Sequence, residues 1–427
     1  MPSTTYGAVL RLPGVARLFV VSFLARIPAA MVGVVLTLHV VSRLDRGYGQ
    51  AGVVVGAATV GMALGAPWRG RLVDRLGLRR AIAPSVVVES AVWLVAPHLA
   101  YEMLILAAAV AGLFLVPVFS VSRQSLSVLV PIAHQKAAFS LDSVAVELTF
   151  MLSPVVGVLL ATQASTSVAL TVVGALTVGG GVLLMWANPP TRSERSTDPA
   201  AELPKQRLVS PALVVLLLAG VAASFVLVGT DVSLVATLND SGRSADIGWM
   251  IALWAGGSVV GGLVHGASHR NPSPLVLVAL LGLATIPAAF ATGQVWLAVA
   301  VVVAGLPCAP ALSSINATLV RLVPEHRRGE VMGWSGTMST VGNALGAPLC
   351  GAVIDHATPG AGFLTASVVG GGLAVGGLVV LALVRGQGRV GSEVEERPAR
   401  RHMPTVRAVR RRAATSTRRV RVRRPSR

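Results

Sequence analysis

The chain has 427 residues, of which 53% are hydrophobic and only 13% are charged, and its mean hydropathy is +0.72. This composition excludes an ordinary soluble domain, in which about a quarter of the residues are charged. It indicates an all-α protein that crosses a membrane many times. The formal net charge of +18 does not indicate a nucleic-acid-binding protein, because segment 386–427 alone holds fourteen Arg and only three Glu.

Twelve apolar segments follow one another along the chain. Nearly all have about 18 residues or more, which is enough to cross a hydrocarbon core of ~30 Å as a helix. The first has basic residues before it but is too long for a signal peptide, so we expect it to remain as a membrane span. The twelve spans are predicted near residues 17–42, 50–68, 81–97, 102–125, 139–162, 165–187, 209–238, 245–266, 274–292, 294–320, 331–355 and 362–385.

The basic residues between the spans are unevenly distributed. If both termini are cytoplasmic, the inside loops hold seventeen Lys and Arg without the tail, and the outside loops hold three. The positive-inside rule then predicts this orientation. We therefore expect a multi-pass protein of the plasma membrane with both termini in the cytoplasm.

A polar segment at 188–208 divides the chain into two halves of six spans each. We expect an N-terminal six-helix bundle at 1–187, a cytoplasmic central loop at 188–208 and a C-terminal six-helix bundle at 209–385. Segment 386–427 is expected to be a basic, disordered cytoplasmic tail attracted to anionic lipid head groups. Nucleic acid is not expected as its partner, because the tail lacks aromatic side chains for base stacking.

The two halves repeat each other in sequence. LVPIAHQKAAFSLDSVAVELTFMLSPVVG in the first half aligns with LVPEHRRGEVMGWSGTMSTVGNALGAPLCG in the second. Pro154 and Gly157 in span five thereby correspond to Pro348 and Gly351 in span eleven. Such a parallel repeat is expected where two similar bundles pack around one central site.

The stretch GRLVDRLGLRR joins the second and third spans. It resembles the signature of the major facilitator superfamily at that position through Gly70, Leu72, Asp74, Arg75, Gly77, Arg79 and Arg80. Leu78 departs from the pattern, which usually has a basic residue there. The resemblance covers about residues 10–385 and implies two pseudo-symmetric six-helix bundles that transport a small molecule by alternating access.

A second resemblance points to export. Efflux members of this superfamily carry a Gly-Pro motif in span five, and this chain has Ser153 before Pro154 and Gly157 after it, a degenerate match. PGVARLFVVSFLARIPAAMVG and LDSVAVELTF are similar to actinobacterial-type efflux permeases. The resemblance implies proton-coupled efflux of an amphipathic or drug-like compound. Uptake of a metabolite, proton-coupled or facilitated, and a non-transporting receptor or scaffold that acts through the basic tail are the alternatives.

We single out four ionisable residues within the predicted spans, because an unpaired charge there is costly. The resemblance implies that spans one and five are neighbours, so we expect Arg26 and Glu147 to form a buried ion pair. This pair either holds the first bundle together or makes Glu147 a proton-titratable switch. Asp231 in span seven is a candidate for protonation or for binding a cationic substrate, unless it is simply hydrated at the outer mouth. Arg123 either joins the charge network of the loop signature or is a snorkelling arginine at a helix end.

The loop signature is also predicted to form a conformational latch. Gly70 would permit a close helix approach and Gly77 a tight turn. Asp74 would pair with a basic group or cap a helix N-terminus of the opposite bundle, with that of span eleven as the expected partner. Such a contact would stabilise one state of the transporter and break in the other.

The sequence shows no catalytic motif, nucleotide-binding loop or metal-ligand cluster. Cys308 and Cys350 lie within apolar runs and suggest neither a disulfide nor a metal site. We therefore expect a protein that is not an enzyme, has no cofactor and draws on an ion gradient, with protons as the coupling ion. We also expect a monomer.

Overall fold

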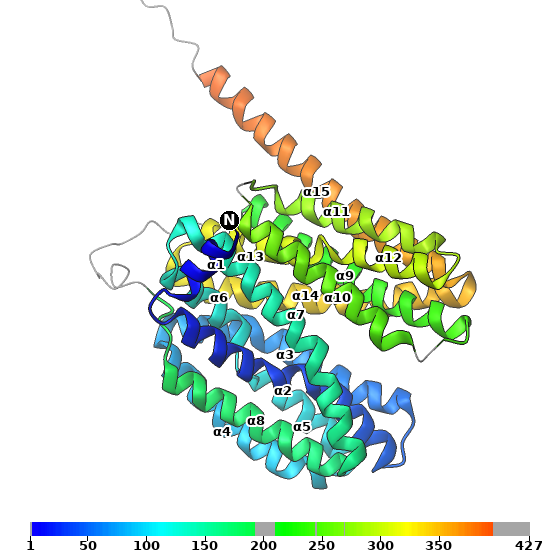
Figure 1. The fold of residues 1–427 in the computed structure, drawn as a ribbon. Coiled ribbons are helices and arrows are strands. Elements are labelled where there is room, and N and C mark those ends of the chain that lie inside the picture. Colours follow the sequence, from blue (N-terminus) through cyan, green and yellow to red (C-terminus); the bar gives the residue numbers. More distant parts are fainter. Residues whose placement is uncertain (1, 193–209, 244–245, 269, 396–427) are drawn as a thin grey trace, which may run out of the picture. The chain divides into compact units, whose positions relative to one another are not determined.

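A computed structural model of the chain describes residues 2–192, 210–243, 246–268 and 270–395 (Figure 1). The chain divides into two units, residues 1–381 and 382–427. Most of the predicted central loop and residues 396–427 of the predicted tail lie outside the described residues. The last helix continues to Glu395, ten residues into the segment predicted to be disordered.

The first half of the protein is built from helices that follow the first six predicted spans. Their bounds are α1 Pro2–Leu10, α2 Val15–Ser42, α3 Tyr48–Leu76, α4 Leu78–Val95, the 3-10 helix η1 Ala96–His98, α5 Tyr101–Phe114, α6 Val118–Leu129, α7 Ile132–Gln163 and α8 Thr166–Ala187. Because α3 is longer than the predicted second span, most of the loop signature is helical. The turn into α4 is made by Gly77, whose φ of 76° places it where only glycine is relaxed, so the predicted tight turn is confirmed.

The second half contains the remaining helices. Their bounds are α9 Pro211–Asp240, α10 Ile247–Ala267, α11 Pro274–Thr285, the 3-10 helix η4 Ile286–Phe290, α12 Gln294–Gly305, α13 Cys308–Leu322, the 3-10 helix η5 Glu325–Arg327, α14 Arg328–His356 and α15 Pro359–Glu395. Within the described part of the chain, eleven helical segments are long and apolar enough to cross a membrane. The shorter apolar segment Pro274–Phe290 takes the place of the predicted ninth span.

Two predicted spans are interrupted in the middle. The fourth is divided into α5 and α6 at Leu115–Pro117, and the tenth into α12 and α13 at Leu306–Pro307. Proline has no N–H to donate to the helix and its ring clashes with the preceding turn, which accounts for both breaks. The interruptions fall in the fourth span of the first half and the fourth span of the second.

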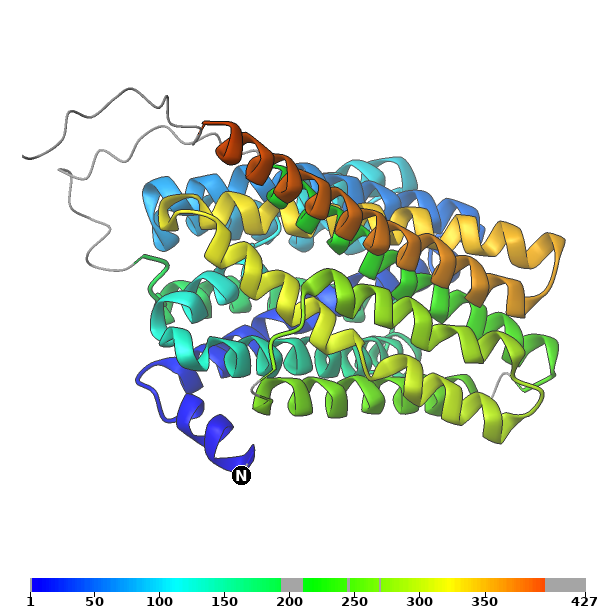
Figure 2. The same ribbon diagram turned by 90° about the horizontal axis from the view of Figure 1, so that it is seen from above.

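Four helices, two from each half, form the boundary between the halves. In Figures 1 and 2, α3 and α7 of the first half face α10 and α14 of the second, while α4, α8, α11 and α12 lie farther out. The second half has one large hydrophobic core, to which Phe139 of α7 also belongs. Large apolar side chains such as Leu94 and Val295 are exposed on the outer helices. In a membrane protein these side chains contact lipid.

Candidate functional site

Asp74, near the end of α3, binds the first turn of α14. Its Oδ1 accepts a hydrogen bond from the backbone N–H of Gly329 at 3.0 Å, and its Oδ2 accepts one from Glu330 at 2.9 Å. These N–H groups have no partner within α14, and the helix dipole favours a negative charge beside them. The predicted contact between Asp74 and span eleven is therefore confirmed, and it joins the two halves.

One helical turn before Asp74, the backbone of α3 is in direct contact with that of α14. A Cβ atom on Gly70 would lie 2.1 Å from the carbonyl oxygen of Gly329, and one on Gly333 would lie 2.4 Å from that of Ala66. Thr337 on α14 donates a hydrogen bond to the Ala63 carbonyl at 2.7 Å. The close approach predicted for Gly70 is confirmed, because no larger residue fits at this contact. We call the end of the protein at which Gly77 joins α3 to α4 the hairpin end.

The arginines of the loop signature do not share one role. Arg75, Arg79 and Arg80 are exposed, and Arg79 Nε donates to the Met185 carbonyl at the end of α8 at 2.9 Å. The ion pair with the opposite half is made instead by Arg71, whose Nε lies 2.9 Å from Glu330 Oε1. Since the Arg71 side chain is half exposed, this pair contributes little to stability by itself.

A second contact between the halves joins α7 to α10, also at the hairpin end. A Cβ atom on Gly266 of α10 would lie 2.8 Å from Ser140 Cβ of α7, and one on Gly262 would lie 3.0 Å from a Val144 methyl group. Lys136 Nζ donates to the Ser268 carbonyl at 2.9 Å, just after α10 ends. The α7–α10 pair is thus a second glycine-mediated approach between the two halves, like that of α3 to α14.

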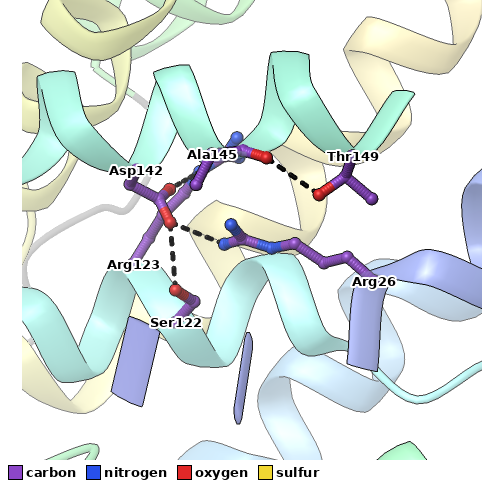
Figure 3. A network of polar contacts seen from close by, with 6 residues as sticks. All are labelled: Arg26, Ser122, Arg123, Asp142, Ala145 and Thr149. Atoms are coloured by element: carbon purple, nitrogen blue, oxygen red, sulfur yellow. Dashed lines mark hydrogen bonds and ion pairs between the residues drawn. The ribbon is translucent and has the colours of Figure 1, made fainter. Parts of the chain in front are cut away.

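Arg26 of α2 forms a buried ion pair with Asp142 of α7, not with Glu147 (Figure 3). Arg26 Nη2 lies 2.7 Å from Asp142 Oδ1, and both side chains are almost fully buried. The predicted Arg26–Glu147 pair is wrong. Five residues along a helix correspond to a rotation of about 140°, so Glu147 points away from the face of α7 that meets α2.

The Asp142 carboxylate also binds two residues of α6. Ser122 donates to Asp142 Oδ1 at 3.2 Å, and Arg123 Nε lies 3.7 Å from Asp142 Oδ2 (Figure 3). Arg123 therefore belongs to the network around Asp142. It neither joins the charge network of the loop signature nor snorkels at a helix end, so both of its predicted roles are wrong. Asp142 was missed at the sequence level although it lies inside the predicted fifth span, where any ionisable residue is a signal.

Glu147 faces the second half of the protein. Cys308 Sγ of α13 donates to Glu147 Oε1 at 3.3 Å. Asp231 of α9 is exposed and lies within electrostatic range of Glu147. Of the three predicted coupling residues, Glu147 and Asp231 therefore lie within electrostatic range of each other, and Arg26 pairs elsewhere.

Glu89 of α4 is a further buried carboxylate that the sequence reasoning missed. It lies in the predicted third span, is fully buried, and accepts a hydrogen bond from Trp93 Nε1 through Oε2. Its Oε1 has no hydrogen-bond partner among the described residues. The signal that could have found it is the one that found Glu147, a single acidic residue inside an apolar run.

The prolines and glycines of spans five and eleven are less equivalent than the repeat predicts. Gly157 packs against α2, where an added Cβ would lie 3.0 Å from a Val35 methyl group. Gly351 has open space beside it, and α14 packs on α9 through Gly342 instead, where a Cβ would lie 2.4 Å from the Val221 carbonyl. Pro154 and Pro348 both lie inside continuous helices.

In the described ranges, no group of three or more His, Cys, Asp or Glu side chains is arranged to hold a metal ion. Comparison with curated protein sequences gives no significant match. Comparison with solved structures gives many. They show the fold alone, because sequence identity to the structures described below is under 20%.

Three structures illustrate the similarity. The human organic anion transporter MFSD10 (TETRAN) has a TM-score of 0.69 at 17% identity over 86% of this chain and 100% of its own. A bacterial homologue of the iron transporter ferroportin, in an outward-facing state, has a TM-score of 0.67 at 15% identity over 86% and 100%. The fucose:proton symporter of Escherichia coli has a TM-score of 0.64 at 14% identity over 85% and 98%.

The family model "Major Facilitator Superfamily" matches residues 18–291 and 216–421. These ranges cover most of the chain, and the similar solved structures have the same fold. Proteins of this family move small molecules across membranes and are not enzymes. The chain therefore belongs to the major facilitator superfamily and is a multi-pass membrane transporter.

Proposed function

We propose that the protein is a secondary transporter that works by alternating access and exports a small amphipathic or drug-like molecule in exchange for protons. The observation that carries the proposal is the pair of hydrogen bonds from Gly329 and Glu330 to Asp74. They join the two halves through groups that can separate without breaking either helix. Two packed bodies with a separable contact are what a rocking mechanism requires.

The form described here corresponds to one end of that cycle. The contacts of α3 with α14 and of α7 with α10 close the hairpin end. The distribution of Lys and Arg supports a cytoplasmic location for this end. We therefore assign the structure to a state closed toward the cytoplasm, from which the substrate site is reached from outside.

Proton coupling is assigned to Glu147 and Asp231. Glu147 belongs to the first half and binds Cys308 of the second, so the charge on this carboxylate affects the free energy of separating the halves. Asp231 adds a second carboxylate from the second half within electrostatic range. Two carboxylates of like charge repel, so proton uptake by one of them stabilises the arrangement described here. Arg26 is not included, because Asp142 neutralises it within the first half.

The proposal also covers the location of the protein, its oligomeric state and the direction of transport. We place the protein in the plasma membrane with both termini in the cytoplasm, as a monomer. The basic residues after Arg385 would then face anionic lipid head groups, although most of them lie outside the described residues. Export is preferred over uptake because of the Pro154–Gly157 motif in α7.

Flux into and out of proteoliposomes under an imposed pH gradient tests the proposal. A panel of cationic, neutral and sugar-like compounds is offered to the wild-type protein and to Glu147→Gln and Asp231→Asn. Glu102→Gln, an exposed carboxylate at the start of α5, is the control. We expect proton-driven export that both coupling variants lose and the control keeps. Flux that ignores a collapsed gradient would refute proton exchange, and flux only in the opposite direction would identify uptake.

A further inference from the structure

A cavity of about 490 Å³ lies inside the first half of the protein. It is lined by residues of α2, α3, α4, α5, α7 and α8 and by Leu115, with none from the second half. Its volume lies within the range of roughly 300–1,000 Å³ in which proteins bind small molecules. The cavity is therefore large enough for a compound of several rings.

The walls of this cavity are almost entirely apolar. Among the described residues that line it, Thr37, Thr59 and Thr177 carry hydroxyl groups, and each donates to a carbonyl oxygen of its own helix at 2.8 Å. Trp93 and Phe150 contribute aromatic rings. An occupant must therefore present mainly apolar and aromatic surface to these walls.

Among the described residues, Glu89 is the one charged residue of the cavity wall. Its Oε2 is held by Trp93 Nε1, while Oε1 is buried with no partner in the described part of the chain. Arg69 acts on Glu89 electrostatically, but its Nε donates to the Gly65 carbonyl at 3.2 Å and it forms no ion pair there with Glu89. A buried carboxylate oxygen that accepts no hydrogen bond destabilises the folded protein, and a cation bound beside it offsets that cost.

We propose that the cavity binds an organic cation with an apolar, ring-containing body, and that Glu89 is its counter-ion. The proposal names the substrate class and so rests on the proposed function. The free group in the wall is an acceptor, which favours a cation and disfavours an anion. The rings of Trp93 and Phe150 add cation–π attraction. Phe150 of the cavity wall lies one helical turn from Glu147 on α7, the helix that carries the carboxylate assigned to proton coupling.

Equilibrium binding to the purified full-length protein in detergent tests the site. The probe is tetraphenylphosphonium, a permanent cation with four rings, and neutral triphenylphosphine is its uncharged counterpart. Glu89→Gln keeps an acceptor for Trp93 but removes the charge, and Glu102→Gln removes an exposed charge outside the cavity. We expect Glu89→Gln to weaken cation binding at least tenfold while binding of the neutral compound and of either compound by the control stays unchanged.

A second variant keeps the charge and fills the space. Ala30→Phe places a ring into the cavity from α2, and we expect it to weaken binding of both compounds while Glu89 remains. Size-exclusion chromatography and circular dichroism establish that each variant is folded. Unchanged cation affinity in Glu89→Gln, or unchanged binding of both compounds in Ala30→Phe, would overturn the proposal.

Proteoliposome flux separates failure of this site from failure of the proposed function. Proton-coupled export that persists, together with binding of tetraphenylphosphonium that does not depend on Glu89, would leave the transport cycle intact and refute the cation site. Binding of tetraphenylphosphonium that depends on Glu89, together with flux that ignores the proton gradient, would refute proton exchange and support the site.

Discussion

The carboxylate of Asp74 lies 3.0 Å from the backbone nitrogen of Gly329, across the boundary between the two halves of the transporter. This contact uses three features of the chain at once. Asp74 provides the charge, the α14 N-terminus provides unpaired donors, and the absence of a side chain on Gly70 and Gly329 lets the backbones meet. The charge of Asp74 and the close approach at Gly70 can be tested separately.

Replacing Asp74 with Asn should slow transport without preventing insertion into the membrane. The amide keeps one acceptor but loses the charge that favours the helix N-terminus, and hydrogen bonds to charged groups contribute about 1.5–3 kcal/mol. We expect the initial flux to fall about tenfold, since ~1.4 kcal/mol is a factor of ten in a conformational equilibrium. Flux assays with Asp355→Asn, an exposed carboxylate at the other end of α14, provide the control. Normal turnover in Asp74→Asn would argue against a latch.

Gly70→Ala should force the hairpin end apart. The new methyl group would lie 2.1 Å from the Gly329 carbonyl oxygen, so α3 and α14 must separate. Gly56→Ala, on the same helix, has open space and should behave like the wild type. We expect faster labelling of the buried Cys308 by a membrane-permeant maleimide in Gly70→Ala only. Equal labelling rates in the two variants would show that this contact does not close the hairpin end.

Asp142→Asn should destabilise the protein more than Arg26→Gln does. The first change leaves Arg26 and Arg123 buried without a counter-ion, and breaking a buried pair in this way costs about 3–5 kcal/mol. The second change leaves Arg123 paired with Asp142. Thermal unfolding in detergent should therefore rank wild type, Arg26→Gln and Asp142→Asn in decreasing order of stability. A reversed order of the two variants would contradict the assigned network.

Glu147→Gln should remove the pH dependence of transport while preserving the contact with Cys308, because the amide oxygen can still accept a hydrogen bond. We expect flux of the variant to be independent of pH, whereas flux of the wild type changes with pH. Counterflow without a proton gradient should persist, since exchange of substrate does not require net proton movement. A wild-type pH profile in the variant would remove Glu147 from the coupling step.

Tyr6 of the N-terminal helix α1 links the two halves from outside the spans. Its hydroxyl donates to the Leu263 carbonyl of α10, and burial raises the pKa of Tyr6 to about 12. A raised pKa favours the neutral phenol in the folded state, so the contribution of Tyr6 to stability is complete below its ordinary pKa of about 10. This contribution is lost as the pH rises from about 10 through 12.

The difference in unfolding temperature between the wild type and Tyr6→Phe measures this contribution. It should be constant from pH 7 to about 10 and shrink toward pH 12. Taking the difference cancels the titration of other groups that both proteins share. A difference in unfolding temperature that stays constant through pH 12 would show that ionisation of the Tyr6 hydroxyl does not affect stability.

Much of the architecture could be predicted from the sequence because the physical causes are local. Each span is set by a long, mostly apolar run, and the position of Gly77 sets the turn between α3 and α4. The contact of Asp74 with α14 was also predictable, since a helix N-terminus is the natural partner of a buried carboxylate at an interface. The family followed from residues Gly70 to Arg80 and was confirmed by the family model.

The sequence by itself therefore determined the spans, the two halves and the carboxylate that joins them. Only the tertiary structure decided that Arg26 pairs with Asp142, that Glu147 faces the second half, and that Glu89 lies in the wall of a cavity. The physical reason is helical phase. Neighbouring acidic residues on one helix point in directions that differ by about 100° per residue, and which direction meets an arginine, a thiol or an empty space depends on how the helices pack.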